Sequence, residues 1–238
     1  MDLGTLIPDL ATGAAAGAAG LALALVAGSG AAALRRRGVR VAYTRKLFHF
    51  GIFTGAGAVH AWAGLAATNA YGATVAALVL VAVLRGEGDA FYEALARETD
   101  RPHRSLFIVV PLLTTAVGGL LSGLLAGPWA AVGYVVAGWG DAVGEPVGAR
   151  WGRHPYRVPS LAGVPAIRTW EGSSAVLVAG WGAAVLVAAG LGVPPAVALL
   201  PSLGVAVGAT AVEALSPHGT DNLTVQVTAS ALSVLLLA

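Results

Sequence analysis

The chain has 238 residues, of which 57% are hydrophobic and 11% charged, and its mean hydropathy is +0.77. This composition excludes an ordinary soluble globular protein, in which about 25% of the residues are charged. The absence of cysteine excludes disulfide frameworks, thiolate metal sites and cysteine nucleophiles. The formal net charge is only +2 and the basic residues lie in small groups, so we expect no nucleic-acid partner.

Eight apolar runs separate the charged residues, at positions 5–33, 47–66, 69–84, 105–127, 128–148, 173–192, 194–213 and 222–238. A helix needs about 20 apolar residues to cross a hydrocarbon core. The first run has neither a basic start nor a cleavage site, so we expect a retained membrane helix and not a signal peptide. The runs predict an all-α polytopic membrane helix bundle of about eight transmembrane helices, forming a single integral membrane domain over residues 1–238.

The basic residues predict the orientation of this bundle. All 14 Lys and Arg residues follow the first, third and fifth apolar runs. With eight helices and the N-terminus outside, every one of them is cytoplasmic, as the positive-inside rule requires. A seven-helix alternative fuses 47–66 with 69–84 and divides the basic loops between the two faces. We therefore keep both runs and expect a turn near Thr68-Asn69.

Two segments outside these runs are expected at the cytoplasmic surface. Residues 85–104 alternate acidic and basic side chains around apolar ones, which predicts a short amphipathic helix. Residues 149–172 are expected to form a loop that carries part of the active site. The absence of a cleavable signal is compatible with a bacterial plasma (inner) membrane, with the active site facing the cytoplasm.

Acidic residues at the ends of membrane helices are costly and are therefore candidates for function. On the eight-helix topology five of them meet at one depth on one face: Asp141, Glu145, Glu171, Glu213 and Asp221. Structural roles remain open for three of them. Glu171 and Asp221 are also suited to complement a helix N-terminal dipole, and Glu145 to pair with Arg150.

The segment between the fifth and sixth runs has the composition of a phosphate cradle. Guanidinium groups, glycine-flanked backbone N–H groups and a Ser/Thr-containing helix start bind phosphate. The candidates are Gly148, Arg150, Arg153, His154, Arg168, Thr169, Gly172 and Ser173, with His218 close to the site in sequence. Anchoring to anionic headgroups is the alternative for the arginines. Carboxylates beside such a cradle favour Mg²⁺-dependent nucleotide chemistry.

A third basic group opens the second expected helix on the same face of the membrane. Arg45 and His49 are four residues apart and share a helix face, and Lys46 lies beside them. An ordinary basic anchor that extends to the headgroups remains the alternative for Arg45 and Lys46.

Four motifs in order carry a resemblance to a known family. They are Arg45-Lys46-x-x-His49, Gly140-Asp141-Ala142 followed by Pro146-x-Gly148-x-Arg150-x-Gly152-x-His154, Arg168-Thr169-x-Glu171-Gly172-Ser173, and Asp221-Asn222-Leu223-Thr224-Val225. Together they resemble the CTP-dependent polyprenol kinases, which include phytol, farnesol and dolichol kinases. Many members have Lys where this chain has Arg168, a change that keeps the charge and alters phosphate geometry.

The resemblance implies a membrane kinase that transfers the γ-phosphoryl group of CTP, or of another nucleoside triphosphate, to a lipid alcohol such as phytol, geranylgeraniol, farnesol or a polyprenol. It implies Mg²⁺ or a similar divalent cation, catalytic roles for Asp141, Lys46 and Arg45, and a role for Gly148 in nucleotide binding. In our interpretation Asp141 and Asp221 ligate the metal with help from Glu171 and Glu213. The arginines and His154 then hold the triphosphate, and Glu145, His49 and Asn222 complete the site.

Two other functions stay open. A phosphatidate cytidylyltransferase, which makes CDP-diacylglycerol, is disfavoured because residues 216–221 resemble only a fragment of that family's signature. An ion-coupled transporter is disfavoured because transporter sites tend to lie at the bilayer midplane between repeated halves, and no repeat is visible here. The sequence leaves the identity of the alcohol, the nucleotide base and the oligomeric state undetermined.

Overall fold

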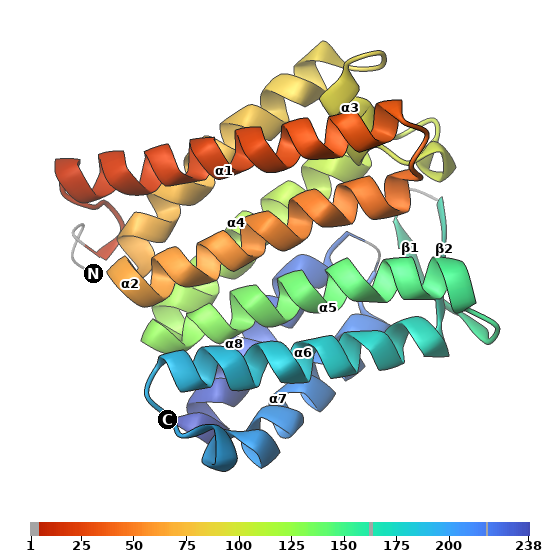
Figure 1. Ribbon diagram of the computed structural model, residues 1–238. Helices are drawn as coiled ribbons and strands as arrows, with labels where there is room; N and C mark the ends of the chain where they lie inside the picture. The colour runs from red at the N-terminus through yellow and green to blue at the C-terminus, as the bar shows by residue number, and fades with distance from the viewer. Residues whose placement is uncertain (1–4, 162–163, 218) are drawn as a thin grey trace.

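The computed structural model describes residues 5–161, 164–217 and 219–238. Over these residues the chain is helical apart from one two-stranded hairpin (Figure 1). The long helices are α1 (Leu10–Arg36), α2 (Val41–Arg85), α4 (Leu106–Ala126), α5 (Ala130–Trp151), α6 (Trp170–Gly190), α7 (Pro195–Leu215) and α8 (Asp221–Leu237). The shorter elements are α3 (Ala90–Leu95), two 3₁₀ turns (Glu98–Asp100 and Gly127–Trp129), β1 (Pro155–Leu161) and β2 (Val164–Thr169).

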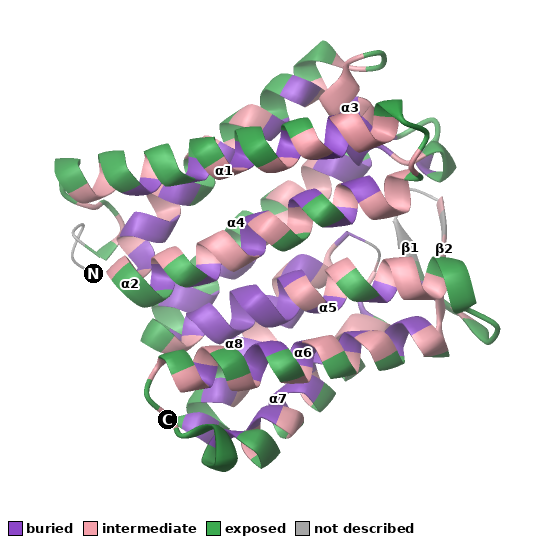
Figure 2. Ribbon diagram, in the orientation of Figure 1, coloured by how far each residue is buried: buried purple, intermediate pink, exposed green. Residues whose placement is uncertain are grey.

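Among the described residues, five helical stretches are long and apolar enough to cross a membrane: Leu10–Arg36, Val41–Arg85, Leu106–Trp151, Trp170–Gly190 and Pro195–Leu215. Large apolar side chains such as Trp62, Leu84 and Leu200 are exposed on the outside of the bundle, where Figure 2 shows exposed residues along the outer helices. A surface of this kind is stable against lipid and not against water. This is the architecture of a polytopic helical membrane protein. The count of eight crossings and the orientation stay predictions.

The α2 helix is broken at Gly64, which adopts φ 72°. This left-handed conformation favours glycine because it has no Cβ. The chain turns back at this point, and the Tyr71 hydroxyl donates to the carbonyl of Ile52 at 2.9 Å across the two halves. The turn expected near Thr68-Asn69 was therefore placed four residues too late. Thr68 instead stabilises the break by donating to the Gly64 carbonyl at 2.8 Å.

Residues 85–104 do not form the single amphipathic helix that was expected. Only Ala90–Leu95 is α-helical, because Gly86 and Gly88 adopt positive φ and interrupt the helix before it. The segment is held instead by the buried guanidinium of Arg104, which lies 2.7 Å from Glu93 and 3.2 Å from Glu98. The hydrogen bond from Arg104 keeps the pKa of Glu93 below its usual value. Residues 85–104, the surface segment, are therefore held together by ion pairs around Arg104.

The segment 149–172 was expected to form a loop, but most of its described residues lie in helices or strands, which corrects that prediction. The α5 helix continues to Trp151, α6 begins at Trp170, and an antiparallel β1–β2 hairpin connects them. Thr169 ends β2 and caps α6, since its hydroxyl accepts from the Gly172 N–H at 3.1 Å. Figure 1 shows the hairpin, α3, the start of α2 and the end of α5 at the same end of the bundle. The three basic segments of the sequence thus meet at one end.

Close helix packing at glycine predicts the first mutational effect. Gly133 of α5 faces α8, and a Cβ at this position would collide with the Ser230 hydroxyl and lie 2.5 Å from the Gln226 carbonyl oxygen. Backbone cannot give way as a side chain can, so we expect Gly133→Ala to destabilise the bundle by about 1–3 kcal/mol. Thermal unfolding in detergent measures this loss.

Gly182→Ala in α6 is the matched control, because a Cβ there meets nothing within 4 Å. It is expected to raise stability by up to about 1 kcal/mol through helix propensity. Equal unfolding temperatures for the two variants would contradict the close α5–α8 contact.

Candidate active site

The centre of the site is a buried amine between two carboxylates. Lys46 of α2 lies 2.6 Å from Asp141 and 2.8 Å from Glu145, both on α5. The two acids are four residues apart and therefore share one face of their helix. The Lys46 side chain is 2% exposed, and Asp141 is 26% exposed. Of these three residues only Asp141 also lines the large cavity that is described below.

Asp141 has a second partner on α2. The His49 Nε2 atom lies 3.2 Å from Asp141, and the His49 ring stacks on Phe53 at a centroid distance of 4.2 Å. Arg45 lies 3.5 Å from Glu145. The structure therefore brings together the basic residues of α2 and the acids of α5, as the sequence analysis placed them on one face of the membrane.

Arg97 was missed in the sequence, although it reaches this cluster from the surface segment. Its guanidinium lies 3.6 Å from Glu145 and donates two hydrogen bonds of 3.0 Å to the buried Asp100. The Arg-x-x-Asp spacing at 97–100 was the available signal. It was overlooked because the whole segment was read as an amphipathic helix with solvent-facing charges. The surface segment and α5 are thus connected by an ion pair.

A second ionic cluster lies at the end of β2. The Arg168 guanidinium is 2.8 Å from Glu213 of α7 and 2.9 Å from Asp221 of α8. One side chain therefore joins the hairpin to two helices. The two carboxylates are brought together as predicted, but their partner in the structure is an arginine that was assigned to phosphate binding.

The two clusters meet at a small hollow of about 10 Å³, which is lined by Asp141, Glu213, Asp221 and Asn222. That space is close to the volume that one water-sized sphere needs. One buried carboxylate oxygen of Glu213 has no hydrogen-bond partner within the part of the chain that the structure describes. Carboxylate and amide oxygens are the ligands that Mg²⁺ prefers, so the chemistry of this donor set fits a divalent cation.

The predicted metal ligands are not all placed alike. Among the described residues, no three His, Asp or Glu side chains are arranged as a ready-made metal site. Asp141 is paired with Lys46, and Glu213 and Asp221 are paired with Arg168, whereas Glu171 contacts His154. Its carboxylate is 2.6 Å from His154 Nδ1, and His154 is 74% exposed.

The predicted nucleotide-binding residues divide into two groups. Arg150, Arg153 and His154 are exposed around the end of α5 and the start of the hairpin. The others lie at the first turn of α6: Thr169, which caps the helix, Gly172, and Ser173, whose hydroxyl is 2.6 Å from that of Tyr156. His218 lies outside the described residues.

Two glycines of this group have a packing role that the sequence did not reveal. A Cβ at Gly148 would lie 2.9 Å from the Thr169 hydroxyl, and one at Gly172 would lie 3.0 Å from the Gly144 carbonyl oxygen. These glycines therefore let α5 approach the start of α6 closely. Their backbone N–H groups remain part of the candidate cradle, but packing alone is a sufficient reason for glycine at both positions.

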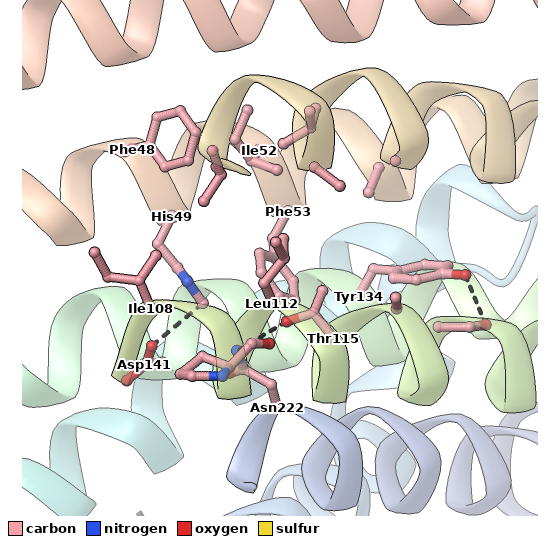
Figure 3. A pocket seen from close by; sticks show the side chains of 18 of the residues that line it. Phe48, His49, Ile52, Phe53, Ile108, Leu112, Thr115, Tyr134, Asp141 and Asn222 are labelled. Atoms are coloured by element: carbon pink, nitrogen blue, oxygen red, sulfur yellow. Dashed lines mark hydrogen bonds and ion pairs between the residues drawn. The ribbon is translucent and has the colours of Figure 1, made fainter. Parts of the chain in front are cut away.

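A cavity of about 380 Å³ extends from the first cluster into the bundle. Arg45, His49, Asp141, Asp221 and Asn222 line its polar end. The rest is largely apolar, and Figure 3 shows Phe53 and Leu112 between Asp141 at one end and Tyr134 at the other.

Thr115 and Tyr134, both missed in the sequence, also line this cavity. Thr115 accepts a hydrogen bond of 2.9 Å from the side-chain amide of Asn222. A polar residue within an apolar run was the signal available for each. The cavity has the size and lining of a small-molecule site.

The fold and this site define a polytopic helical membrane protein in which a cluster of carboxylates and basic side chains lies at one end of an apolar cavity. Over 110 residues the chain is 34% identical to the phytol kinase of Synechocystis sp.. The aligned stretch covers 46% of this chain and 44% of that kinase, which is less than half of either. No protein-family profile matches the chain, and no solved structure matches it. The similarity supports a relationship to the polyprenol and phytol kinases.

Proposed function

We propose that the protein is a membrane kinase that transfers the γ-phosphoryl group of CTP, or of another nucleoside triphosphate, to the hydroxyl of an isoprenoid lipid alcohol. The observation that carries the proposal is the cavity, in which an apolar channel ends at Asp141. An isoprenoid alcohol has the same division into a long apolar chain and one polar end. The similarity to a phytol kinase supports the same class of substrate.

Asp141 is the proposed catalytic residue. The substrate hydroxyl would lie against its carboxylate, which accepts the proton as the oxygen attacks the γ-phosphorus. The bond from the γ-phosphorus to the bridging oxygen breaks, and the nucleoside diphosphate leaves. Lys46 and His49 hold Asp141 in place through the contacts of 2.6 and 3.2 Å. Phosphoryl transfer depends mainly on such positioning and on charge neutralisation.

The second cluster and the α6 N-terminus are the proposed nucleotide site. Arg168, the capped first turn of α6 and the exposed Arg150 and Arg153 would neutralise the triphosphate. Asp141, Glu213 and Asp221 would hold Mg²⁺, which when bound neutralises charge on the phosphates. Glu171 was predicted as a further ligand, and its contact with His154 favours a role in orienting that ring toward the nucleotide.

The proposed topology places this end of the bundle in the cytoplasm, where nucleotides are found. Eight crossings, an outside N-terminus and a bacterial plasma membrane complete that proposal. The gathering of the basic segments at one end supports it, because positive loops are retained on the cytoplasmic side. Cysteine-accessibility labelling at position 36 and at position 192 would test it, since the chain has no cysteine of its own.

The testing experiment is a transfer assay on the purified protein in detergent. Mg²⁺ and γ-labelled CTP, UTP and ATP are offered with phytol, geranylgeraniol, farnesol, a long polyprenol and diacylglycerol. Label in an extracted prenyl phosphate is the expected result. Pyrophosphate release with phosphatidate would overturn the kinase in favour of a cytidylyltransferase. Silence in both reactions, together with ion-dependent uptake in vesicles, would favour a transporter.

A further inference from the structure

The end of the cavity that is far from Asp141 is closed by a layer of paired polar groups. The buried Tyr134 donates its hydroxyl proton to the Gly119 carbonyl at 2.8 Å. Its ring lies 5.3 Å from the ring of His60, which contacts Thr68 at 3.1 Å and the Gly127 carbonyl at 2.9 Å. These contacts connect the break of α2 at Gly64 to the 3₁₀ turn at Gly127–Trp129. Thr68, Gly119 and Tyr134 of this layer line the cavity, and we call the layer its floor.

The cavity is shallow between Asp141 and this floor. Asp141 and Tyr134 are seven residues apart on α5, which at the helical rise corresponds to about 10 Å. Both residues line the cavity, at the opposite ends shown in Figure 3. A long isoprenoid chain whose hydroxyl lies at Asp141 therefore does not fit between the acid and the floor.

The side wall near the floor differs from the wall near Asp141. Phe107 and Ile108 of α4, near the acid, are buried, whereas Ala116 and Leu120 further along the same helix are exposed. On the second half of α2, Gly72 and Ala73 line the cavity and are also exposed. The cavity thus reaches the outside of the bundle between these two helices.

Over the described residues, α1 does not cover this opening. The segment before α1 contacts the cavity wall at Asn69, whose side-chain amide donates to the Leu6 carbonyl at 3.0 Å. Gly17 and Gly20 of α1 pack against Thr74 of α2, and the Thr74 hydroxyl donates to the Gly17 carbonyl at 3.1 Å. Gly72 and Ala73 are exposed beside this contact. The opening therefore faces the lipid that surrounds the bundle.

We propose that the tail of the lipid alcohol leaves the cavity sideways, between the second half of α2 and α4, so that the site selects the hydroxyl-proximal part of the chain and not its total length. This inference rests on the proposed function. Lipid tails are as apolar as the cavity wall, so moving part of the substrate tail from the cavity into the bilayer costs little free energy. Turnover per enzyme is then expected to rise with the chain length of the alcohol until the chain fills the cavity, and to stay constant for longer prenols.

The test narrows the opening and compares alcohols of increasing length. Ala116→Trp places a large ring at the opening. The matched control is Val117→Trp, because Val117 is the next residue of α4, is exposed and does not line the cavity. We expect Ala116→Trp to lower kcat/KM for geranylgeraniol and a long polyprenol by about tenfold or more relative to geraniol. Val117→Trp should leave the ratio unchanged.

A second variant separates an open cavity from a closed one that measures chain length. Tyr134→Leu removes the ring at the floor, and its fold is checked by thermal unfolding. If the tail leaves sideways, this variant keeps the wild-type dependence on chain length. A sharp length optimum in the wild type that moves to longer alcohols in Tyr134→Leu would overturn the inference.

The failure of the inference is distinguishable from the failure of the proposed function. If the wild type phosphorylates no alcohol of any length, the proposed function is wrong. If it phosphorylates prenols and Ala116→Trp affects short and long ones equally, the function stands and the lateral exit is wrong. The rise in unfolding temperature that each alcohol causes in the absence of nucleotide measures binding alone. It allows short and long alcohols to be compared between the wild type and Ala116→Trp without the transfer reaction.

Discussion

Asp141→Asn is expected to lower phosphoryl transfer by about three orders of magnitude, the upper range for removal of one group that acts on developing charge. The amide does not accept the hydroxyl proton, and because it is neutral it binds a divalent cation more weakly than the carboxylate does. The fold should persist, because Lys46 keeps its 2.8 Å contact with Glu145 and is not left as an isolated buried charge.

The measurement is label transfer from γ-labelled nucleotide to the prenol, together with the unfolding temperature in detergent. Glu145→Gln is the matched control, since it also removes one carboxylate from Lys46 but leaves Asp141 and its contact of 2.6 Å. We expect the control to lose much less activity. Near-normal transfer by Asp141→Asn in a folded protein would remove Asp141 from the catalytic machinery.

The second large effect concerns stability at Arg168. Arg168→Met would leave the carboxylates of Glu213 and Asp221 without their cation, and both side chains are less than 20% exposed. Removing one partner of a buried ion pair costs about 3–5 kcal/mol. We expect a loss of this size in the free energy of unfolding. Arg168→Lys should recover part of it, because an ammonium group keeps the charge but lacks the fork that reaches both acids.

Unfolding in detergent, followed by tryptophan fluorescence, measures the Arg168 series. The matched control is Arg157→Met, on the neighbouring strand, which removes an exposed arginine and is expected to change stability by no more than about 0.5 kcal/mol. Equal stability of Arg168→Met and the wild type would contradict the ionic connection between the hairpin, α7 and α8.

The sequence was sufficient to predict where the long helices lie, but not where a helix breaks. Long apolar runs predict spans because composition and length alone decide whether a helix is stable in lipid. The position of a break depends on the backbone conformation of a single residue. Gly64 is one of several glycines in its apolar run, and each of them is able to adopt the left-handed conformation. The hairpin lies in the segment that was expected to form a loop, and it contains three residues that disfavour strands, Pro155, Pro159 and Pro165.

The candidate site was predictable by residue type and not by pairing. Asp141 was singled out because an acid at a membrane helix end is costly, and Lys46 because it opens the second expected helix on the same face of the membrane. Their direct contact was not foreseen, since they are far apart in the chain and the sequence pattern says only that both lie at one membrane face. Tyr134 and Thr115 escaped notice because a single hydroxyl in an apolar helix is cheap and common.

The buried Lys46 has a consequence for how the protein is made. During synthesis α2 leaves the ribosome before α5, so the amine of Lys46 has no carboxylate partner from α5 until that helix is made. Until then it is stable only while its long side chain reaches the headgroups. The early half of the chain is therefore expected to stay shallow and loosely assembled in the membrane until α5 is inserted. Arrest of translation before α5 should leave Lys46 accessible to amine-reactive reagents, and release from the arrest should protect it.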